Sequence, residues 1–161
     1  MNLNGFHRRF LGNTRSSVWY VDRRMGKNFA VLLDLVKYNF PFVILPDEDH
    51  RLFQGRIDSL YSVMKSKTIT LVKASNFSNL TLVDIGKKAD VVYFLEYGRY
   101  PEVVRDFILE SIKDIHSPVS LLKLVALDEF PVHFIGTEHD DELHSISETL
   151  LFPLGRIPKD Y

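Results

Sequence analysis

The stretch VWYVDRRMGKNFAVLLDLV, residues 18–36, joins a short apolar run to a longer apolar segment through a polar turn that ends in Gly26-Lys27. The first run predicts a strand over 18–21. The second predicts a helix over 28–38, because its apolar residues recur at helical spacing: Phe29, Leu32, Leu33 and Val36. A turn between a strand and a helix N-terminus can bind phosphate through its backbone N–H groups and a Lys side chain. The stretch therefore predicts an α/β fold and a candidate phosphate loop.

The composition is that of an ordinary globular domain. The chain has 161 residues, of which 45% are hydrophobic and 25% charged, and these values predict a single domain over residues 1–161. A net charge of −1 argues against a free-standing nucleic-acid binder and leaves room only for a local basic patch. The absence of cysteine excludes disulfides, thiolate metal sites and a cysteine nucleophile. No apolar run approaches the ~18 residues of a membrane span, so we expect no membrane partner and an intracellular protein.

The N-terminal segment is basic. Residues 1–16 contain Arg8, Arg9 and Arg15, and no acidic residue occurs before Asp22. This pattern is typical of a mobile basic arm that binds nucleic acid or a partner, and equally of a polar terminus without a function of its own.

Along the rest of the chain, predicted strands alternate with predicted helices. Apolar runs favour strands over 42–46, 68–72, 80–85, 89–98, 117–127 and 130–136. Helices are expected over 47–66, over 101–115 and, as a short one, in the tail 139–161. Strands that are apolar throughout are typical of a sheet covered on both faces. The pattern predicts a three-layer α/β fold with a mainly parallel sheet of about five strands and helices on both faces.

Two segments resemble a known family of ATPases. The turn Asp22-Arg23-Arg24-Met25-Gly26-Lys27 resembles the R-x-x-G-K-[ST] loop of the large terminase subunits, which pump DNA into the capsids of phages and herpesvirus-type viruses. Asn28 replaces the final Ser or Thr. Residues 86–109 resemble the family's Asp-Glu strand and following helix, with Leu95 at the Asp position and Glu96 at the Glu position.

A third segment resembles the strand that follows in the same family. The run 120–127 occupies its place, although Ala126-Leu127-Asp128 departs from the small-hydroxyl motif that ends the family's strand. The three segments lie in the family's order and extend the resemblance over about residues 16–130.

The resemblance implies a fold of the phosphate-loop NTPase type and a role for each matching residue. Lys27 would contact phosphates, Gly26 would allow close approach of the backbone, and Glu96 would be the relic of the acid that activates water. Three further residues complete the implied nucleotide site: Arg23, Arg24 and Asn28. ATP is the implied cofactor. Mg²⁺ is doubtful and no metal site is assigned, because an amide and an apolar side chain replace the hydroxyl and carboxylate that would hold the ion.

The function implied is that of a degenerate ATPase from a virus or prophage. It would bind nucleotide or phosphate weakly or not at all, and serve as a structural or regulatory component of a DNA-packaging or DNA-handling assembly. Its partners would be other protein subunits, with DNA reached through the assembly, in the host cytoplasm or the virion. Two alternatives stay open. One is an active Mg²⁺-dependent ATPase that recruits its metal through Asn28, Asp22 or Asp128, and the other is an interaction protein that retains only the fold.

Other candidate residues have simpler interpretations. The segment 138–144 has His and acidic residues but not the spacing that places two imidazoles on one helix face, so we expect a solvated helix start rather than a metal site. We expect the same of the acidic pairs Asp47/Asp49 and Asp140/Asp141. His133 is expected to be a core or edge histidine. The aromatic residues Tyr93, Phe94, Tyr97 and Tyr100 could stack on a base, but burial of alternate ones in or beside the sheet is favoured.

Overall fold

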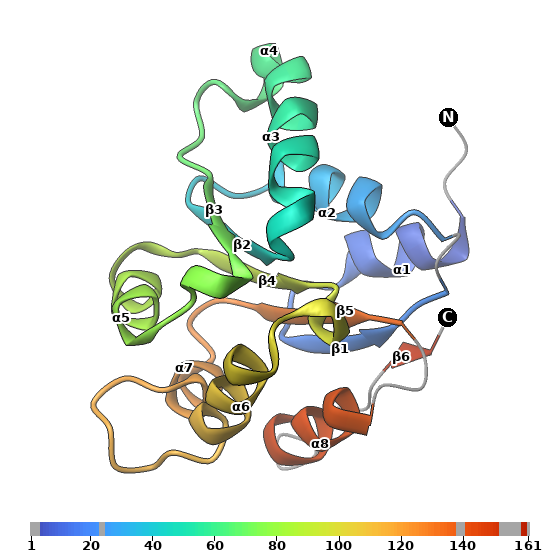
Figure 1. The fold of residues 1–161 in the computed structure, drawn as a ribbon. Helices are drawn as coiled ribbons and strands as arrows, with labels where there is room; N and C mark the ends of the chain where they lie inside the picture. The colour runs from blue at the N-terminus through green and yellow to red at the C-terminus, as the bar shows by residue number, and fades with distance from the viewer. Residues whose placement is uncertain (1–3, 23–24, 138–140, 152–158, 161) are drawn as a thin grey trace.

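A parallel β-sheet forms the centre of the fold (Figure 1). The structure is a computed structural model that describes residues 4–22, 25–137, 141–151 and 159–160. In this part of the chain the sheet has six strands in the order β3-β2-β4-β5-β1-β6, and all recorded pairings are parallel. The strands are β1 (Ser17–Tyr20), β2 (Pro41–Leu45), β3 (Thr70–Lys73), β4 (Val91–Leu95), β5 (Val132–Gly136) and the two-residue β6 (Lys159–Asp160).

Helices cover both faces of this sheet, as Figure 1 shows. One face carries α1 (Gly5–Gly12), α2 (Lys27–Leu35), α3 (His50–Ser59) and the short α4 (Tyr61–Met64). The other carries α5 (Asn79–Lys88), α6 (Glu102–Ser111), α7 (Leu121–Leu127) and α8 (Asp141–Leu150). Short 3₁₀ turns whose residues are all described join strands to helices at η2 (Asp47–Asp49), η3 (Ala74–Asn76) and η4 (Tyr97–Arg99). The three-layer α/β architecture is thus confirmed.

The apolar residues of β4 show why the sheet is covered on both sides. Successive side chains of a strand point to opposite faces. Tyr93 and Leu95 belong to the cluster beneath α1, α2 and α3, whereas Val92 and Phe94 belong to the cluster beneath the later helices. All four are at most 1% exposed. A strand buried on both faces reads as a continuous apolar run, which is the pattern from which it was predicted.

Most predicted elements agree with the structure, but two predicted strands are helices. Residues 80–85 lie in α5 and residues 117–127 contain α7. Ser78 and Thr81 form a capping box at the start of α5, and the Ser120 hydroxyl accepts a hydrogen bond from the Lys123 N–H at the start of α7. A short apolar run does not distinguish a strand from a buried helix, and in both cases the serine at the helix start is the feature that separates the two.

The N-terminal segment also differs from the arm or polar terminus considered for residues 1–16. Residues Gly5–Gly12 form α1, and the side chains of Phe6 and Phe10 are completely buried against Trp19 of β1. The described part of this segment is therefore a packed element of the core. Arg8 and Arg9 lie on its exposed side.

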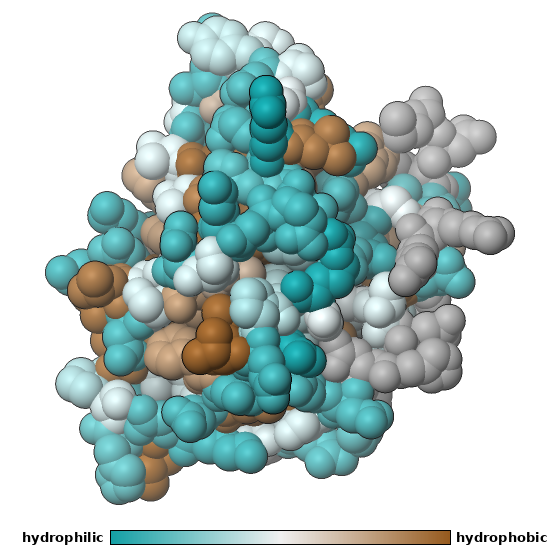
Figure 2. Space-filling model, viewed as in Figure 1, coloured by the Kyte–Doolittle hydropathy of each residue, from teal (hydrophilic) through white to brown (hydrophobic). Residues whose placement is uncertain are grey.

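The surface shown in Figure 2 is mainly hydrophilic and is broken by small hydrophobic patches. The most exposed large apolar side chains are Leu80 and Val103, at 78% and 75%. None of the described helices combines the length and the apolar character needed to cross a membrane.

Candidate functional site

The predicted site residues meet at the carboxyl edge of the sheet. Because the strands are parallel, the segments that follow β1, β4 and β5 all leave from this edge, where ligands bind in open α/β sheets. The Val21 N–H donates to the Gly136 carbonyl (2.7 Å) and the Glu96 N–H to the Ile135 carbonyl (2.8 Å). These bonds continue the sheet into the segments that follow β1 and β4, and so fix the positions from which the site residues extend.

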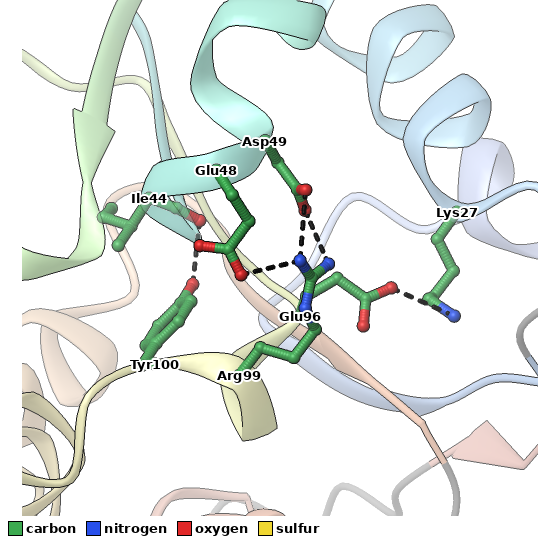
Figure 3. A network of polar contacts seen from close by, with 7 residues as sticks. All are labelled: Lys27, Ile44, Glu48, Asp49, Glu96, Arg99 and Tyr100. Carbon is green, nitrogen blue, oxygen red and sulfur yellow. Dashed lines mark hydrogen bonds and ion pairs between the residues drawn. The ribbon is translucent and has the colours of Figure 1, made fainter.

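An ion pair between Lys27 and Glu96 forms the core of the site (Figure 3). Lys27 is the first residue of α2, and its Nζ lies 3.1 Å from Glu96 Oε1 and 3.5 Å from the Val21 carbonyl oxygen. Its side chain is 5% exposed and that of Glu96 15%. A lysine this deeply buried requires a partner for its charge. Since β5 lies between β1 and β4, the pair spans the end of β5.

The backbone of Glu96 adopts a left-handed conformation, with φ 58° and ψ 49°. This conformation costs about 1–2 kcal/mol for a residue with a Cβ atom. Glu96 is also the point at which β4 ends and η4 begins. The site therefore holds a strained residue that carries one half of its buried ion pair.

The turn after Glu96 is tied to the end of β2 by two neighbouring side chains. The Arg99 guanidinium donates to Glu48 Oε1 (2.7 Å) and Asp49 Oδ2 (2.8 Å), and the Tyr100 hydroxyl donates to the Ile44 carbonyl (2.8 Å), as Figure 3 shows. Burial raises the pKa of Tyr100 well above its ordinary value. The pKa of Glu48 is lowered, first by its own backbone N–H and then by Arg99. These contacts hold η4, and with it Glu96, against the neighbouring strand.

The loop before Lys27 is held by α1. Gly26 precedes α2 with φ 72°, a left-handed conformation that favours glycine. A Cβ atom at this position would lie 2.9 Å from His7 Nε2. The same nitrogen lies 3.1 Å from the Gly26 carbonyl oxygen, and the Asn4 side-chain amide donates to the Met25 carbonyl at 3.0 Å.

The structure brings together three of the residues named as site candidates, Gly26, Lys27 and Glu96. Asn28 is half-buried as the second residue of α2. Arg23 and Arg24 lie outside the described residues.

Three residues considered as possible positions for Mg²⁺ ligands do not form a metal site in the structure. Leu95 is 1% exposed and packs in the core. Asp128 lies at the opposite edge of the sheet, before β5, where it pairs with Arg15 at 3.6 Å. It therefore contributes nothing to a metal beside Lys27. Asp22 is exposed in the turn, where its carbonyl accepts the Met25 N–H. These residues do not fit the near-octahedral oxygen cage that Mg²⁺ prefers.

Other acidic residues have protein partners. Within the described ranges, no group of three or more His, Asp or Glu side chains is arranged to hold a metal ion. Asp47 accepts hydrogen bonds from the hydroxyl and the N–H of Ser75, which lower its pKa. In α8, His144 lies 2.8 Å from Glu148, whereas residues 138–140 are outside the described part. Asp47 and Asp49 do precede α3, as predicted, but both are engaged by side chains rather than only by water.

The residues expected to serve packing do so. Tyr93, Phe94, Tyr97 and Tyr100 are at most 3% exposed. His133 is fully buried, its Nδ1 lies 2.6 Å from the Ser17 hydroxyl, and burial lowers its pKa to about 3. These side chains belong to the core and not to a ligand site.

Three residues near the site were not predicted. Asn4 and His7 act on the loop from α1, and Thr137 follows β5, the strand that lies between β1 and β4. The segment 120–127, taken as the third family-like strand, is α7 instead. The next strand along the chain is β5, which ends at Gly136 and is followed by Thr137.

Comparison of the sequence with models of known protein families gives no match, and a search among curated proteins also gives none.

Proposed function

We propose that this protein is a terminase-like phosphate-loop domain that has lost catalysis and serves as a structural or regulatory component of a DNA-packaging or DNA-handling assembly. It binds nucleotide or phosphate weakly or not at all. The observation that carries the proposal is the buried ion pair between Lys27 and Glu96 at the carboxyl edge of the sheet. The type of assembly, the viral or prophage origin, and a location in the host cytoplasm or virion rest on the sequence resemblance alone.

The ion pair weakens phosphate binding because a phosphate and Glu96 compete for the same cation. A nucleotide that approached Lys27 would have to replace a carboxylate oxygen at 3.1 Å from Nζ in a site where both partners are largely shielded from water. Charge–charge energies are larger in such a site than at the surface. The displaced carboxylate would then lie beside the phosphates, and like charges repel.

Loss of catalysis is supported by the surroundings of the pair. Phosphoryl transfer depends on a metal ion that neutralises charge on the phosphates. The position that would supply its carboxylate is Leu95, which is buried among apolar side chains. The acid that would activate water is Glu96, and one of its oxygens is engaged by Lys27 at 3.1 Å.

The test measures ATP binding by calorimetry, and ATP turnover with and without Mg²⁺. We expect weak or undetectable binding and negligible turnover by the wild-type protein. The Glu96→Gln variant should bind ATP more tightly, because the amide no longer neutralises Lys27, and adding Lys27→Ala to it should abolish the gain. Glu102→Gln, which removes an exposed acid from the start of α6, is the control for the change in net charge.

Wild-type turnover near ~1 per second, lost in Lys27→Ala, would overturn the proposal, since phosphoryl-transfer enzymes typically work at this rate or faster. An absence of ATP binding by Glu96→Gln would overturn the proposal that the ion pair masks a phosphate site at Lys27. The structural or regulatory role would then belong to a protein that retains only the fold.

A further inference from the structure

We propose that Asn4 and His7 are positioning residues, which hold two peptide planes of the loop so that the N–H groups of Gly26 and Lys27 face away from α1. These two N–H groups are the donors that a phosphate at the start of α2 would use. The role of this orientation in phosphate binding rests on the proposed function, whereas the orientation itself does not.

The direction of the N–H groups follows from the direction of the carbonyls. The Met25 carbonyl accepts a hydrogen bond from the Asn4 side chain at 3.0 Å, and the Gly26 carbonyl lies 3.1 Å from His7 Nε2. The described residues contain no cis peptide bond. In a trans peptide the C=O and the N–H of one plane point in opposite directions. The Gly26 carbonyl also accepts the Ala30 N–H at 3.0 Å, the first hydrogen bond of α2, so the start of that helix and His7 fix this peptide plane together. The Gly26 N–H therefore points away from Asn4, and the Lys27 N–H points away from the side on which Ala30 and His7 bond the carbonyl.

The hydrogen bonds of His7 define its tautomer. Its Nδ1 lies 3.3 Å from the backbone nitrogen of Asn4 and accepts that N–H. The proton of the neutral ring is therefore on Nε2, which donates to the Gly26 carbonyl. The ring is 6% exposed and packs edge-on against Phe29 of α2 at 5.4 Å. His7 is thus held between α1 and α2 with both ring nitrogens engaged.

The helix α1, which carries His7 and is capped by Asn4, is anchored in the hydrophobic core. Phe6 and Phe10 are fully buried and lie within 5.6 Å of each other and of the Trp19 ring, measured between ring centroids. Glycine at position 26 has more backbone freedom than any other residue. Hydrogen bonds from a fixed helix select one conformation of this loop in advance, and such preorganisation reduces the entropy lost on binding.

Asn4 has two separable roles, and this makes the proposal testable. Its Oδ1 caps α1 by accepting the His7 N–H at 2.8 Å, while its Nδ2 donates to the Met25 carbonyl. Aspartate caps helices as well as asparagine but has no amide donor. Asn4→Asp therefore keeps the cap and removes the contact with the loop. Asn13→Asp is the matched control, because Asn13 uses Oδ1 to accept the Arg15 N–H at the other end of α1.

The experiment records amide NMR spectra of full-length wild type, Asn4→Asp and Asn13→Asp, and titrates each with inorganic pyrophosphate. We expect Asn4→Asp to retain the wild-type thermal midpoint, to shift the amide resonances of Gly26 and Lys27, and to bind pyrophosphate about tenfold more weakly, the effect of losing roughly one hydrogen bond. Asn13→Asp should match the wild type. Unchanged Gly26 and Lys27 resonances in Asn4→Asp would overturn the proposal.

A second pair of variants covers the case in which Asn4→Asp disturbs the fold. His7→Phe keeps the ring against Phe29 but loses both nitrogens, whereas His7→Gln keeps an amide donor. We expect the Gly26 and Lys27 resonances of His7→Gln to lie closer to those of the wild type, and the reverse order would overturn the proposal. If no protein binds pyrophosphate but the resonances respond as expected, the positioning role stands and the phosphate-binding function fails.

Discussion

Lys27 Nζ and Glu96 Oε1 lie 3.1 Å apart although their residues follow strands that are not neighbours in the sheet. Lys27 begins the helix after β1, Glu96 follows β4, and β5 separates the two strands. The pair forms because parallel strands end at one edge, where long side chains can meet across the strand between them. The ion pair links the start of α2 to the end of β4, on the far side of β5. Its cation, Lys27, is the buried lysine among the described residues.

Removing one partner of this pair should destabilise the fold. Lys27→Met preserves most of the side-chain volume but leaves the Glu96 carboxylate without its partner. We expect the free energy of unfolding to fall by about 1–3 kcal/mol, the cost of a largely buried polar group left unsatisfied. Urea denaturation of Lys27→Met, Glu96→Gln and the double variant gives the coupling energy, which should be about 1–2 kcal/mol.

The ion pair between Arg105 and Glu142 is the control for this double-mutant cycle. Its atoms are 3.5 Å apart and its side chains are 28% and 32% exposed, so its coupling should be below about 1 kcal/mol. Additive effects of Lys27→Met and Glu96→Gln would show that the buried contact contributes no specific interaction energy.

Gly26→Ala should destabilise the protein and disturb the loop. The new Cβ atom would lie 2.9 Å from His7 Nε2 and would also impose a side chain on a left-handed backbone. The backbone alone costs about 1–2 kcal/mol. We expect a loss of this size or larger in the free energy of unfolding, measured by denaturation.

The same substitution at another glycine, Gly55→Ala, should have the opposite effect on stability. Gly55 lies inside α3, and a Cβ atom there would meet nothing within 4 Å. Alanine in a helix interior is favoured over glycine by about 0.5–1 kcal/mol, so this variant should be more stable than the wild type. Equal effects of the two substitutions would contradict the special conformation of Gly26.

The sequence allowed the layers of the fold to be predicted because the central strands are apolar on both faces. Runs such as 42–46 and 130–136 have no amphipathic alternation, and this pattern correctly indicated a covered parallel sheet. The same apolar character made α5 and α7 resemble strands. Both helices begin after a serine N-cap, Ser78 and Ser120. The strand prediction followed the hydrophobic pattern and gave these caps too little weight.

The site was predicted only in part because its supporting contacts are not local. Gly26 and Lys27 could be placed from the strand–turn–helix pattern, and Glu96 from its position after an apolar strand. Nothing in the spacing of the sequence indicates that Asn4 and His7 reach the loop, since their contacts depend on how α1 packs against α2. The arginines of the N-terminal segment favoured an arm or a polar terminus, whereas its buried residues Phe6 and Phe10 anchor it to the core.

The role of α1 in the core can be tested by Phe10→Ala. Phe10 is fully buried, between Trp19, Tyr93 and His133. Truncation of such a side chain leaves a cavity and typically costs about 3–5 kcal/mol. The thermal midpoint should fall by many degrees, whereas Arg8→Ala on the exposed side of the same helix should change it little. A small effect of Phe10→Ala would mean that α1 is not packed on the core in solution.

Acid should destabilise the protein through His133. Burial lowers the pKa of this imidazole to about 3 from its ordinary value of 6.5, and the positive charge of Lys37 adds to the effect. Trp19 Nε1 donates to the Ser17 hydroxyl, which lies 2.6 Å from His133 Nδ1, so the buried neutral ring has a hydrogen-bonding neighbour. Between about pH 6.5 and pH 3 the unfolded chain binds a proton that the folded chain does not. Stability from this residue is therefore complete above pH 6.5 and falls with acidification, by up to about 1.4 kcal/mol per pH unit.

The contribution of His133 to stability can be separated from that of the carboxylates by comparing the wild type with His133→Asn over a narrow pH range. His133→Asn retains an oxygen acceptor for the Ser17 hydroxyl and does not titrate. Between pH 6.5 and about pH 4.5 most carboxylates remain ionised. Burial raises the pKa of Asp34, so protonation of this residue acts in the opposite direction. Because Asp34 is present in both proteins, its effect cancels in the difference. The free energy of unfolding should therefore decline more steeply with acid in the wild type than in His133→Asn, and parallel curves would show that the buried imidazole is not the group responsible.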